Sequence, residues 1–443
     1  MTDVVLDKEY IAAIDLGSKN IVTVVGLKDK EGNVEILGST VTPSEGMENG
    51  TVRNVESMAI SIKQNVEQLE QQLGVRVEAV YAGVSGRYIK SVRHSYFVFV
   101  SNRDGEVRFD DVKKINESMD NIQVGERERV LDRIPQHYII DNRADEMITN
   151  PVGMFGHKLE NSFIFVVGEN SVISRIENAL GRVGLKQTSL FVNPLVAAEA
   201  VLMPEEKNEG VMFMDIGAGT TDICIYKDNI ARHVVSLPIG GAMINKDIQS
   251  YGLMAKYVET LKVGHGSAVS KLASTDHLIR IKGVAAGDEK IISAQNLSVI
   301  IESRLLDIVE LAMNELKRSG YDGKLRAGIV ITGGVSLTKD IDILFKEHTK
   351  MAVRVATPVI NLVKEGSEIV DDPIYSTAIG ILLRGAKGNT SSMVNAPVSE
   401  IKDDIVDELP EPSKRKKKQG GGLFSKIKKS FDKMLTDIDD NVI

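Results

Sequence analysis

The chain has 443 residues, a formal net charge of −8 and a single cysteine. This length allows two or three domains with a well-buried core. The acidic balance argues against nucleic acid as a partner, because a general nucleic-acid binder presents a basic field. The lone Cys224 excludes a disulfide framework and a cysteine-based zinc site, and favours a small core residue in a reducing compartment.

The first part of the chain predicts strands that alternate with helices. Residues 1–10 lack the basic start and apolar stretch of a signal peptide, which favours a cytosolic protein. Residues 11–25, IAAIDLGSKNIVTVV, predict a hairpin whose first strand ends at Asp15 and whose turn offers backbone N–H groups to an anion. Apolar residues recur at helical spacing over about 55–73, and residues 77–85 predict another buried strand. This succession indicates an α/β sheet packed by helices.

The pattern changes over about residues 86–160. A strand-like run, a helix candidate and a short strand pair over 129–141 carry much of the chain's aromatic content and contain no phosphate-binding phrase. We therefore predict an inserted accessory module. The α/β pattern resumes over 162–170, and residues 194–202 connect into a second lobe.

The second lobe opens with a repeat of the first hairpin. Residues 211–226, VMFMDIGAGTTDICIY, again place an aspartate, Asp215, at the end of an apolar strand before a Gly-containing turn. Helical patterns fill about 243–320. A third phrase, at 329–345, then predicts a strand, a Gly-Gly corner that lets a flat base approach the backbone, and a helix start. Together the three phrases predict ATP held between two related lobes.

The end of the chain differs in composition from the rest. Residues 388–421 contain no aromatic residue and cannot bury enough apolar surface to fold, so they predict a disordered linker with a typical reach of roughly 30 Å. Residues 423–438, placed at about 100° per residue, gather their apolar side chains within roughly 120°. A core helix could share this pattern, but lysines flank the apolar face and the KRKKK run lies upstream, as in a helix lying in an anionic membrane surface. The predicted membrane-facing residues are Leu423, Phe424, Ile427, Phe431, Met434, Leu435 and Ile438.

The paired aspartates define the candidate site. We predict that Asp15 and Asp215 hold the hydration shell of Mg²⁺, an ion that keeps waters and shares phosphate oxygens. Each carboxylate could instead cap its own turn, but their matching contexts favour the metal. Lys19 would offer charge to the β- and γ-phosphates. The pair Glu259 and Lys262, one helical turn apart, is a further candidate that could also be an exposed ion pair.

Other catalytic patterns are absent from the sequence. It contains no GxxxxGK[ST] phosphate-binding loop and no GxSxG or Ser-His-Asp arrangement. Histidines such as His137 and His265 show no metal-ligand spacing and are interpreted as packing or surface residues.

The three phrases resemble the phosphate-1, phosphate-2 and adenosine motifs of the actin/hexokinase/heat-shock-chaperone ATPase superfamily. Within it, the chain resembles the FtsA family of bacterial cell-division proteins over about residues 8–386 and the tail. The resemblance implies an α/β, two-lobed actin-like ATPase fold with an inserted subdomain 1C. The stretches that carry it are IPQHYIID, NPVGMFG, LKVGHG, IVITGGVSL and PIYSTAIGILL.

The resemblance also implies domain boundaries. It assigns 1–85, 161–193 and 372–387 to subdomain 1A and 86–160 to subdomain 1C. Subdomain 2A takes 194–242 and 321–371, and 243–320 forms subdomain 2B. Residues 388–421 are the linker and 422–443 the amphipathic membrane-targeting helix.

Site residues follow from the same resemblance. Glu259 and Lys262 correspond to ribose- and adenine-contacting positions. Asn193 stands before Pro194 where hydrolytic relatives usually place Glu or Gln to orient the attacking water, and Asn is shorter and not a base, so weak or absent hydrolysis is expected. The adenine corner would be Gly333 and Gly334, and the phosphates would lie between Gly17, Ser18, Lys19 and Asn20 on one side and Gly217, Ala218, Gly219, Thr220 and Thr221 on the other. Ala218 replaces the family's more frequent Gly.

The function implied by the resemblance is in cell division. An FtsA-like protein would bind ATP, polymerise, and anchor FtsZ filaments to the cytoplasmic face of the inner membrane at the division site. Its partners would be the FtsZ C-terminal peptide, docked on 243–320 near Arg304, further copies of itself, anionic lipid and later division proteins. A PilM-like pilus-assembly ATPase shares the fold but lacks an amphipathic tail. A sugar or acetate kinase would need a catalytic carboxylate where residues 86–160 stand, and a chaperone would need a folded substrate domain after the second lobe.

Overall fold

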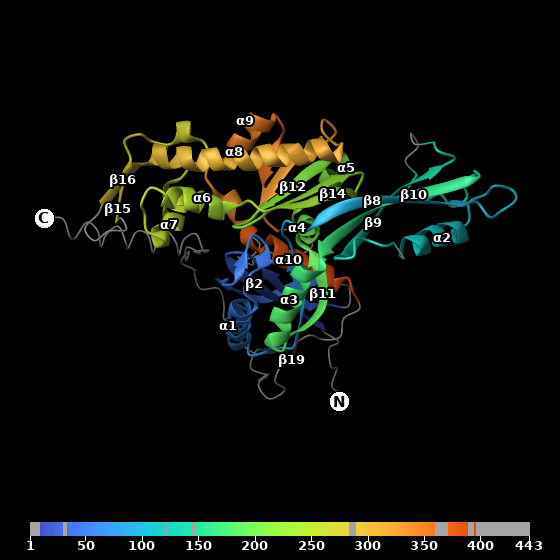
Figure 1. Cartoon of the computed structure of the whole chain (residues 1–443), viewed down its shortest axis with the longest axis horizontal. Coiled ribbons are helices and arrows are strands. Elements are labelled where there is room, and N and C mark those ends of the chain that lie inside the picture. Colours follow the sequence, from blue (N-terminus) through green and yellow to red (C-terminus); the bar gives the residue numbers. More distant parts are fainter. Residues whose placement is uncertain are drawn as a thin grey trace, which may run out of the picture.

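A computed structural model describes residues 9–29, 33–120, 122–143, 148–282, 289–358, 371–388 and 394–395. The linker and amphipathic helix predicted beyond residue 387 lie outside these residues, apart from 388 and 394–395. Two lobes lie one above the other, and the insertion projects to one side at the level of the upper, second lobe (Figure 1). This arrangement confirms the two-lobed α/β fold with an inserted module.

The first lobe is built on a five-stranded sheet in the order β11-β7-β1-β2-β3. β1 and β2 form the predicted hairpin, β3 continues it antiparallel, and β7 and β11 add parallel strands on the other side. Helix α1 spans Val55–Leu73, as predicted, because Asn54 caps its start and Gly74 ends it in a left-handed conformation. The strands are β1 (Glu9–Leu16), β2 (Asn20–Lys28), β3 (Val34–Pro43), β7 (Ala79–Val84) and β11 (Lys186–Val192), with the short pairs β4 (Met47–Glu48)–β5 (Thr51–Val52) and β6 (Arg76–Val77)–β19 (Val394–Asn395).

The second lobe repeats this topology. Its strands run β18-β17-β12-β13-β14, with the second hairpin β12–β13 in the place of β1–β2 and parallel β17 in the place of β7. The sequence repeat is therefore a structural repeat. The strands are β12 (Val211–Ile216), β13 (Thr221–Lys227), β14 (Ile230–Leu237), β17 (Gly328–Thr332) and β18 (Val353–Val355).

Helices of the second lobe flank this sheet (Figure 1). The longest, α8 (Ala294–Ser319), begins at the Ser293 cap and ends at Gly320, whose positive φ of 76° closes it. The remaining elements are α5 (Pro204–Glu209), α6 (Gly241–Gln249), α7 (Ala255–His265), α9 (Ile341–Thr349), the 3₁₀ turns η1 (Ser270–Leu272) and η2 (Gly334–Leu337), and the hairpin β15 (Leu278–Lys282)–β16 (Glu289–Ser293).

The insertion forms a three-stranded antiparallel extension of the second-lobe sheet. β8 (Lys90–Phe99), β10 (Lys158–Glu169) and β9 (Glu128–Ile140) follow β14 in that order, and α2 (Phe109–Asp120) packs on them. The strand pair predicted over 129–141 is wrong, because β9 is one strand. Pro135 does not interrupt it, since β9 is the last strand of the sheet and its pairing with β10 shifts register beside Pro135, two settings in which strands tolerate proline. β10 carries the insertion's sheet to Glu169, and the first lobe resumes with α3 (Asn170–Arg182).

Two helices cross between the lobes. α4 (Asn193–Val201) and α10 (Ser376–Ala386), which follows the 3₁₀ turn η3 (Pro373–Tyr375), are buried along most of their length. They approach closely at Gly380, where an added Cβ would lie 2.1 Å from the Val196 carbonyl oxygen. Only glycine fits this crossing. This close contact sets the position of α4 relative to α10.

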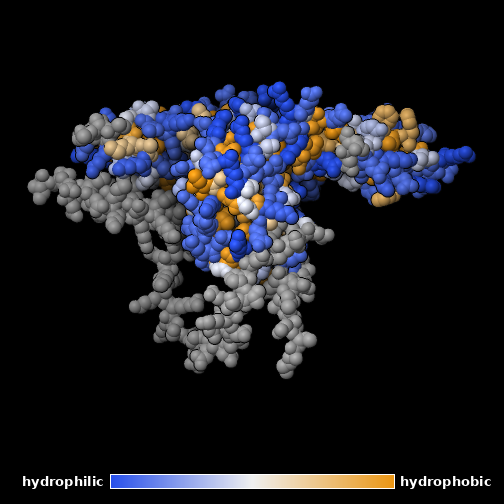
Figure 2. Space-filling view, turned by 60° about the horizontal axis from the view of Figure 1, so that its bottom comes forward, coloured by the Kyte–Doolittle hydropathy of each residue, from blue (hydrophilic) through white to orange (hydrophobic). Residues whose placement is uncertain are grey.

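Cys224 is fully buried in the core, as the sequence predicts. In the described part of the chain, no helix combines the length and apolar character that a membrane crossing requires. Most of the surface seen in Figure 2 is hydrophilic. Large exposed apolar side chains gather on the insertion, where Phe97, Phe99 and Phe155 are all about half exposed or more.

Candidate nucleotide site

A cavity of about 710 Å³ lies between the two lobes. Both hairpin turns, helix α7 and the Gly-Gly corner line it. Twelve of the residues predicted from the sequence share its wall: Asp15, Gly17, Ser18, Lys19, Asn20, Asp215, Gly217, Ala218, Glu259, Lys262, Gly333 and Gly334.

The two hairpin turns have the same geometry and pack against each other. The Gly17 N–H donates to the Asn20 carbonyl at 3.1 Å, and the Gly217 N–H donates to the Thr220 carbonyl at 2.9 Å. Gly219 is required at the contact, since an added Cβ would lie 2.4 Å from the Ser18 hydroxyl oxygen. Gly219 and Thr220, although predicted as phosphate-binding residues, are not among the residues that line the cavity.

Thr221 does not supply a hydroxyl to this cavity. It is fully buried on β13, and its Oγ1 donates to the Ile239 carbonyl at 2.8 Å. Thr221 is the first residue of β13, and side chains alternate between the two faces of a strand. The Thr221 side chain therefore points into the core and not into the cavity.

Asp15 and Asp215 end equivalent strands on opposite sides of the cavity. Burial, with the nearby Asp215 carboxylate, raises the pKa of Asp15 to about 7, and burial raises the pKa of Asp215 to about 6. Two partly buried carboxyls with raised pKa values are more stable beside a cation than as two uncompensated negative charges. Their chemistry therefore fits a hydrated Mg²⁺.

A side chain from each crossing helix holds one of these aspartates. Asn193, at the start of α4, donates from Nδ2 to Asp15 Oδ1 at 3.2 Å. Thr377, in the first turn of α10, donates from Oγ1 to Asp215 Oδ2 at 2.8 Å. Sequence reasoning missed Thr377 because its partner lies 162 positions away.

Asn193 is packed below the cavity. Its side chain is buried against Gly83, where an added Cβ would lie 2.2 Å from Asn193 Oδ1. That oxygen has no hydrogen-bond partner among the described residues. In this position the amide orients the Asp15 carboxylate and does not line the cavity.

Lys19 and Glu259 meet across the cavity. The Lys19 ammonium lies 2.9 Å from Glu259 Oε1, which joins the first lobe to helix α7 of the second. Glu259 Oε2 accepts from Lys262 Nζ at 3.0 Å and from Asn245 Nδ2 at 2.6 Å. Burial raises the pKa of Glu259, but Lys262 and Lys19 outweigh it and hold the value at about 2. Glu259 is thus ionised, and Asn245 is a cavity residue that sequence reasoning missed.

The Gly-Gly corner has two constraints. Gly333 has a φ of 84°, and an added Cβ would lie 2.2 Å from Asp215 Oδ1. Because residue 333 has no Cβ, there is room beside it for the Asp215 carboxylate and for a flat group in the cavity.

Arg304 lies on α8, outside the cavity. Its guanidinium makes two hydrogen bonds to Asp247, at 2.8 and 3.1 Å, and one to Asp307 at 2.9 Å. A peptide carboxylate would have to compete with these two aspartates.

Comparison with known proteins identifies the family. A family model for the cell division protein FtsA matches residues 212–380, and one for the SHS2 domain inserted in FtsA matches residues 86–167. The cell division protein FtsA of Pseudomonas aeruginosa is 32% identical over 386 residues, which is 87% of this chain and 91% of that protein. The chain belongs to the FtsA family. The FtsA proteins of Neisseria meningitidis serogroup B and Bacillus subtilis are 29% and 30% identical, over 95% and 85% of this chain and 98% and 83% of theirs.

Solved structures share the fold at low identity. The PilM–PilN type IV pilus biogenesis complex superposes with a TM-score of 0.60 at 14% identity, over 85% of this chain and 99% of that chain. MreB5 of Spiroplasma citri bound to ADP gives 0.51 at 14% identity, over 84% and 94%. These likenesses show an actin-like fold. FtsA membership outweighs the PilM alternative and places the chain among cell-division proteins.

Proposed function

We propose that this FtsA-family protein binds ATP with Mg²⁺ between its lobes, assembles into actin-like filaments, and anchors FtsZ filaments to the cytoplasmic face of the inner membrane. The observation that carries the nucleotide part is the shared cavity. Residues from two matching hairpins about two hundred positions apart line one space that includes both aspartates.

In the proposed complex each wall has a separate role. The turn N–H groups and Lys19 bind the phosphates, and Asp15 and Asp215 hold the magnesium ion through water. Glu259 and Lys262 contact the ribose and adenine beside Gly333 and Gly334. Magnesium supplies charge compensation for the phosphates, and the phosphates compete with Glu259 for the Lys19 ammonium.

Hydrolysis is proposed to be slow. The amide of Asn193 is neither a base nor within the cavity wall, and its Nδ2 is engaged by Asp15. ATP would then act chiefly by stabilising the closed lobes, a linkage effect of binding to one state.

The membrane and FtsZ parts of the proposal rest on family membership and on sequence. The amphipathic pattern of 423–438 suits a peripheral helix in an anionic surface. The FtsZ peptide is proposed to dock on the helical part of the second lobe, where Arg304 is partly exposed. Later division proteins are proposed as further partners.

Titration of the full-length protein with fluorescent ATP tests the site. Lys19→Ala should weaken binding about tenfold, because it removes a charged contact to phosphate. Asp215→Ala should abolish the magnesium dependence of binding. Lys63→Ala, on the exposed face of α1, is the matched control and should bind as wild type does. Wild-type affinity and magnesium response in both site variants would overturn the assignment.

A further inference from the structure

The insertion is attached to the second lobe although the sequence places it within the first. It begins at Gly86, just after β7 of the first-lobe sheet, yet its strands extend the second-lobe sheet through the pair Val235–Lys90 (Figure 1). We call residues 86–90, which lead into β8, together with residues 136–137 of β9, the root of the insertion. This root lies where the two lobes meet.

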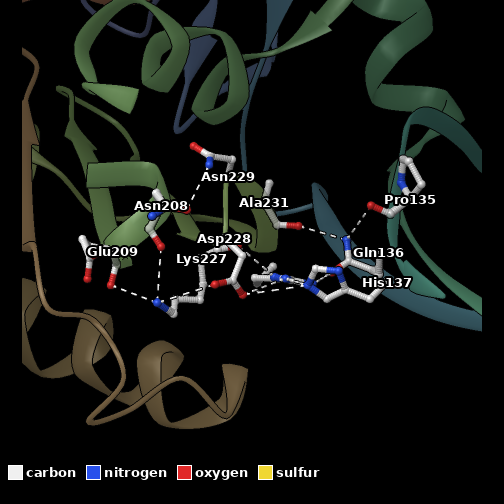
Figure 3. A network of polar contacts seen from close by, with 10 residues as sticks. Pro135, Gln136, His137, Asn208, Glu209, Lys227, Asp228, Asn229 and Ala231 are labelled. Carbon is white, nitrogen blue, oxygen red and sulfur yellow. Dashed lines mark hydrogen bonds and ion pairs between the residues drawn. The ribbon is translucent and has the colours of Figure 1, made fainter. Parts of the chain in front are cut away.

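A buried arginine fastens one side of this root. Arg232 of β14 donates to Gln136 Oε1 at 2.9 Å and to the Lys227 carbonyl at 3.1 Å, and it also contacts His137. Gln136 in turn donates to the Ala231 carbonyl at 3.1 Å. Figure 3 shows Gln136 and His137 of β9 facing the β13–β14 turn through this network. β9 and the second lobe are thus held as one unit.

A second set of contacts leads from the root to the second phosphate turn. The Gly86 N–H donates to Ser236 Oγ at 2.8 Å, and Ser236 donates to the Asp222 carboxyl. Asp222 lies directly opposite Asp215 in the β12–β13 pair. Burial and then the Asp215 charge raise the pKa of Asp222 well above its usual value. Both Ser236 and Asp222 are buried.

A third set leads to the first phosphate turn. The Gly50 N–H donates to Ser18 Oγ at 3.0 Å. Gly50 also lies against the root, since a Cβ added to it would stand 2.8 Å from Gly86 Cα and 3.0 Å from Thr220 Cγ2. Gly86 is therefore held between groups that contact both turns.

We propose that Ser236 is a positioning residue that couples occupancy of the phosphate turns to the order of the insertion's root. The inference rests on the proposed nucleotide site. Anything that moves Asp215 or the second turn shifts Asp222, and Ser236 transmits that shift to Gly86 as a hydrogen bond made or loosened. The coupling would be carried by the strand pair Asp215–Asp222 and by the two hydrogen bonds of Ser236.

Hydrogen exchange of the full-length protein, with and without MgATP, measures this coupling. Peptides around Asp15 report nucleotide binding and peptides from β8 report the root. In wild type, MgATP should slow exchange in β8 by at least about fivefold. Ser236→Ala should lose most of this effect while its peptides around Asp15 remain protected by MgATP. Ser95→Ala, an exposed serine on β8, is the control and should behave as wild type does.

The outcomes separate the two proposals. Protection around Asp15 without any change in β8 of the wild type would refute the coupling and leave the nucleotide site standing. No protection at either place would refute the nucleotide site itself. Ser236→Thr keeps the hydroxyl and should restore the slowing of β8 exchange by MgATP. If Ser236→Ala only loosened the packing, its thermal midpoint would fall, but MgATP would still slow exchange in β8 and around Asp15 alike. A full β8 response in Ser236→Ala would overturn the role of Ser236.

Discussion

Magnesium binding at the paired aspartates should depend steeply on pH. The pKa of Asp15 is raised to about 7 by burial and the Asp215 carboxylate, and that of Asp215 to about 6 by burial. A proton must leave each carboxyl before the ion is held, so affinity rises as the pH rises through these values.

The magnitude follows from the two titrations. Between about pH 6 and about pH 8 the ionised fraction of Asp15 rises about tenfold and that of Asp215 about twofold. Because the two carboxyls interact, these fractions are not independent factors, and apparent Mg²⁺ affinity should rise by about an order of magnitude, or ~1.4 kcal/mol. The assay is the Mg²⁺ midpoint for enhancement of fluorescent-ATP binding by the full-length protein at each pH.

Asp15→Asn is the necessary control, because a terminal phosphate titrates in the same range. The variant keeps the phosphate titration and an amide oxygen for the ion's water shell, but loses the titration of Asp15. Its Mg²⁺ midpoint should therefore lie at a higher concentration and change far less with pH. Equal midpoints at the two pH values in wild type would refute the reasoning, as would an equally large shift in Asp15→Asn.

Three further outcomes are expected. Asn193→Gln should raise phosphate release from a rate well below roughly one per second, because it lengthens the side chain and keeps an amide donor for Asp15; an unchanged rate would contradict the proposed cause of slow hydrolysis. Arg304→Ala should weaken FtsZ-peptide binding several-fold in a polarisation assay, whereas Arg280→Ala on β15 should not; equal affinities for both would remove Arg304 from the contact. Phe431→Glu should release the protein from anionic liposomes while ATP binding persists, and undiminished co-sedimentation would refute tethering by residues 423–438.

Local features of the site could be predicted from sequence because their information is local. A hairpin is specified by two apolar runs and the turn between them, so Asp15 and Asp215 could both be placed at strand ends beside glycine-containing turns. The same holds for the Gly333–Gly334 corner and for helix α1, whose cap residues adjoin it. The resemblance then related these pieces to one another.

Only the tertiary structure decided how these pieces are held. Asn193 reaches Asp15 across 178 positions and Ser236 reaches Gly86 across 150, and no spacing rule relates residues so far apart. The direction in which the Thr221 side chain points is set by the pairing of β13 with its neighbours. The continuity of β9 through Pro135 is set by its place at the end of the sheet. Short-range propensities fix turns and helices, whereas side-chain partners are fixed by the packing of elements that meet only in the folded chain.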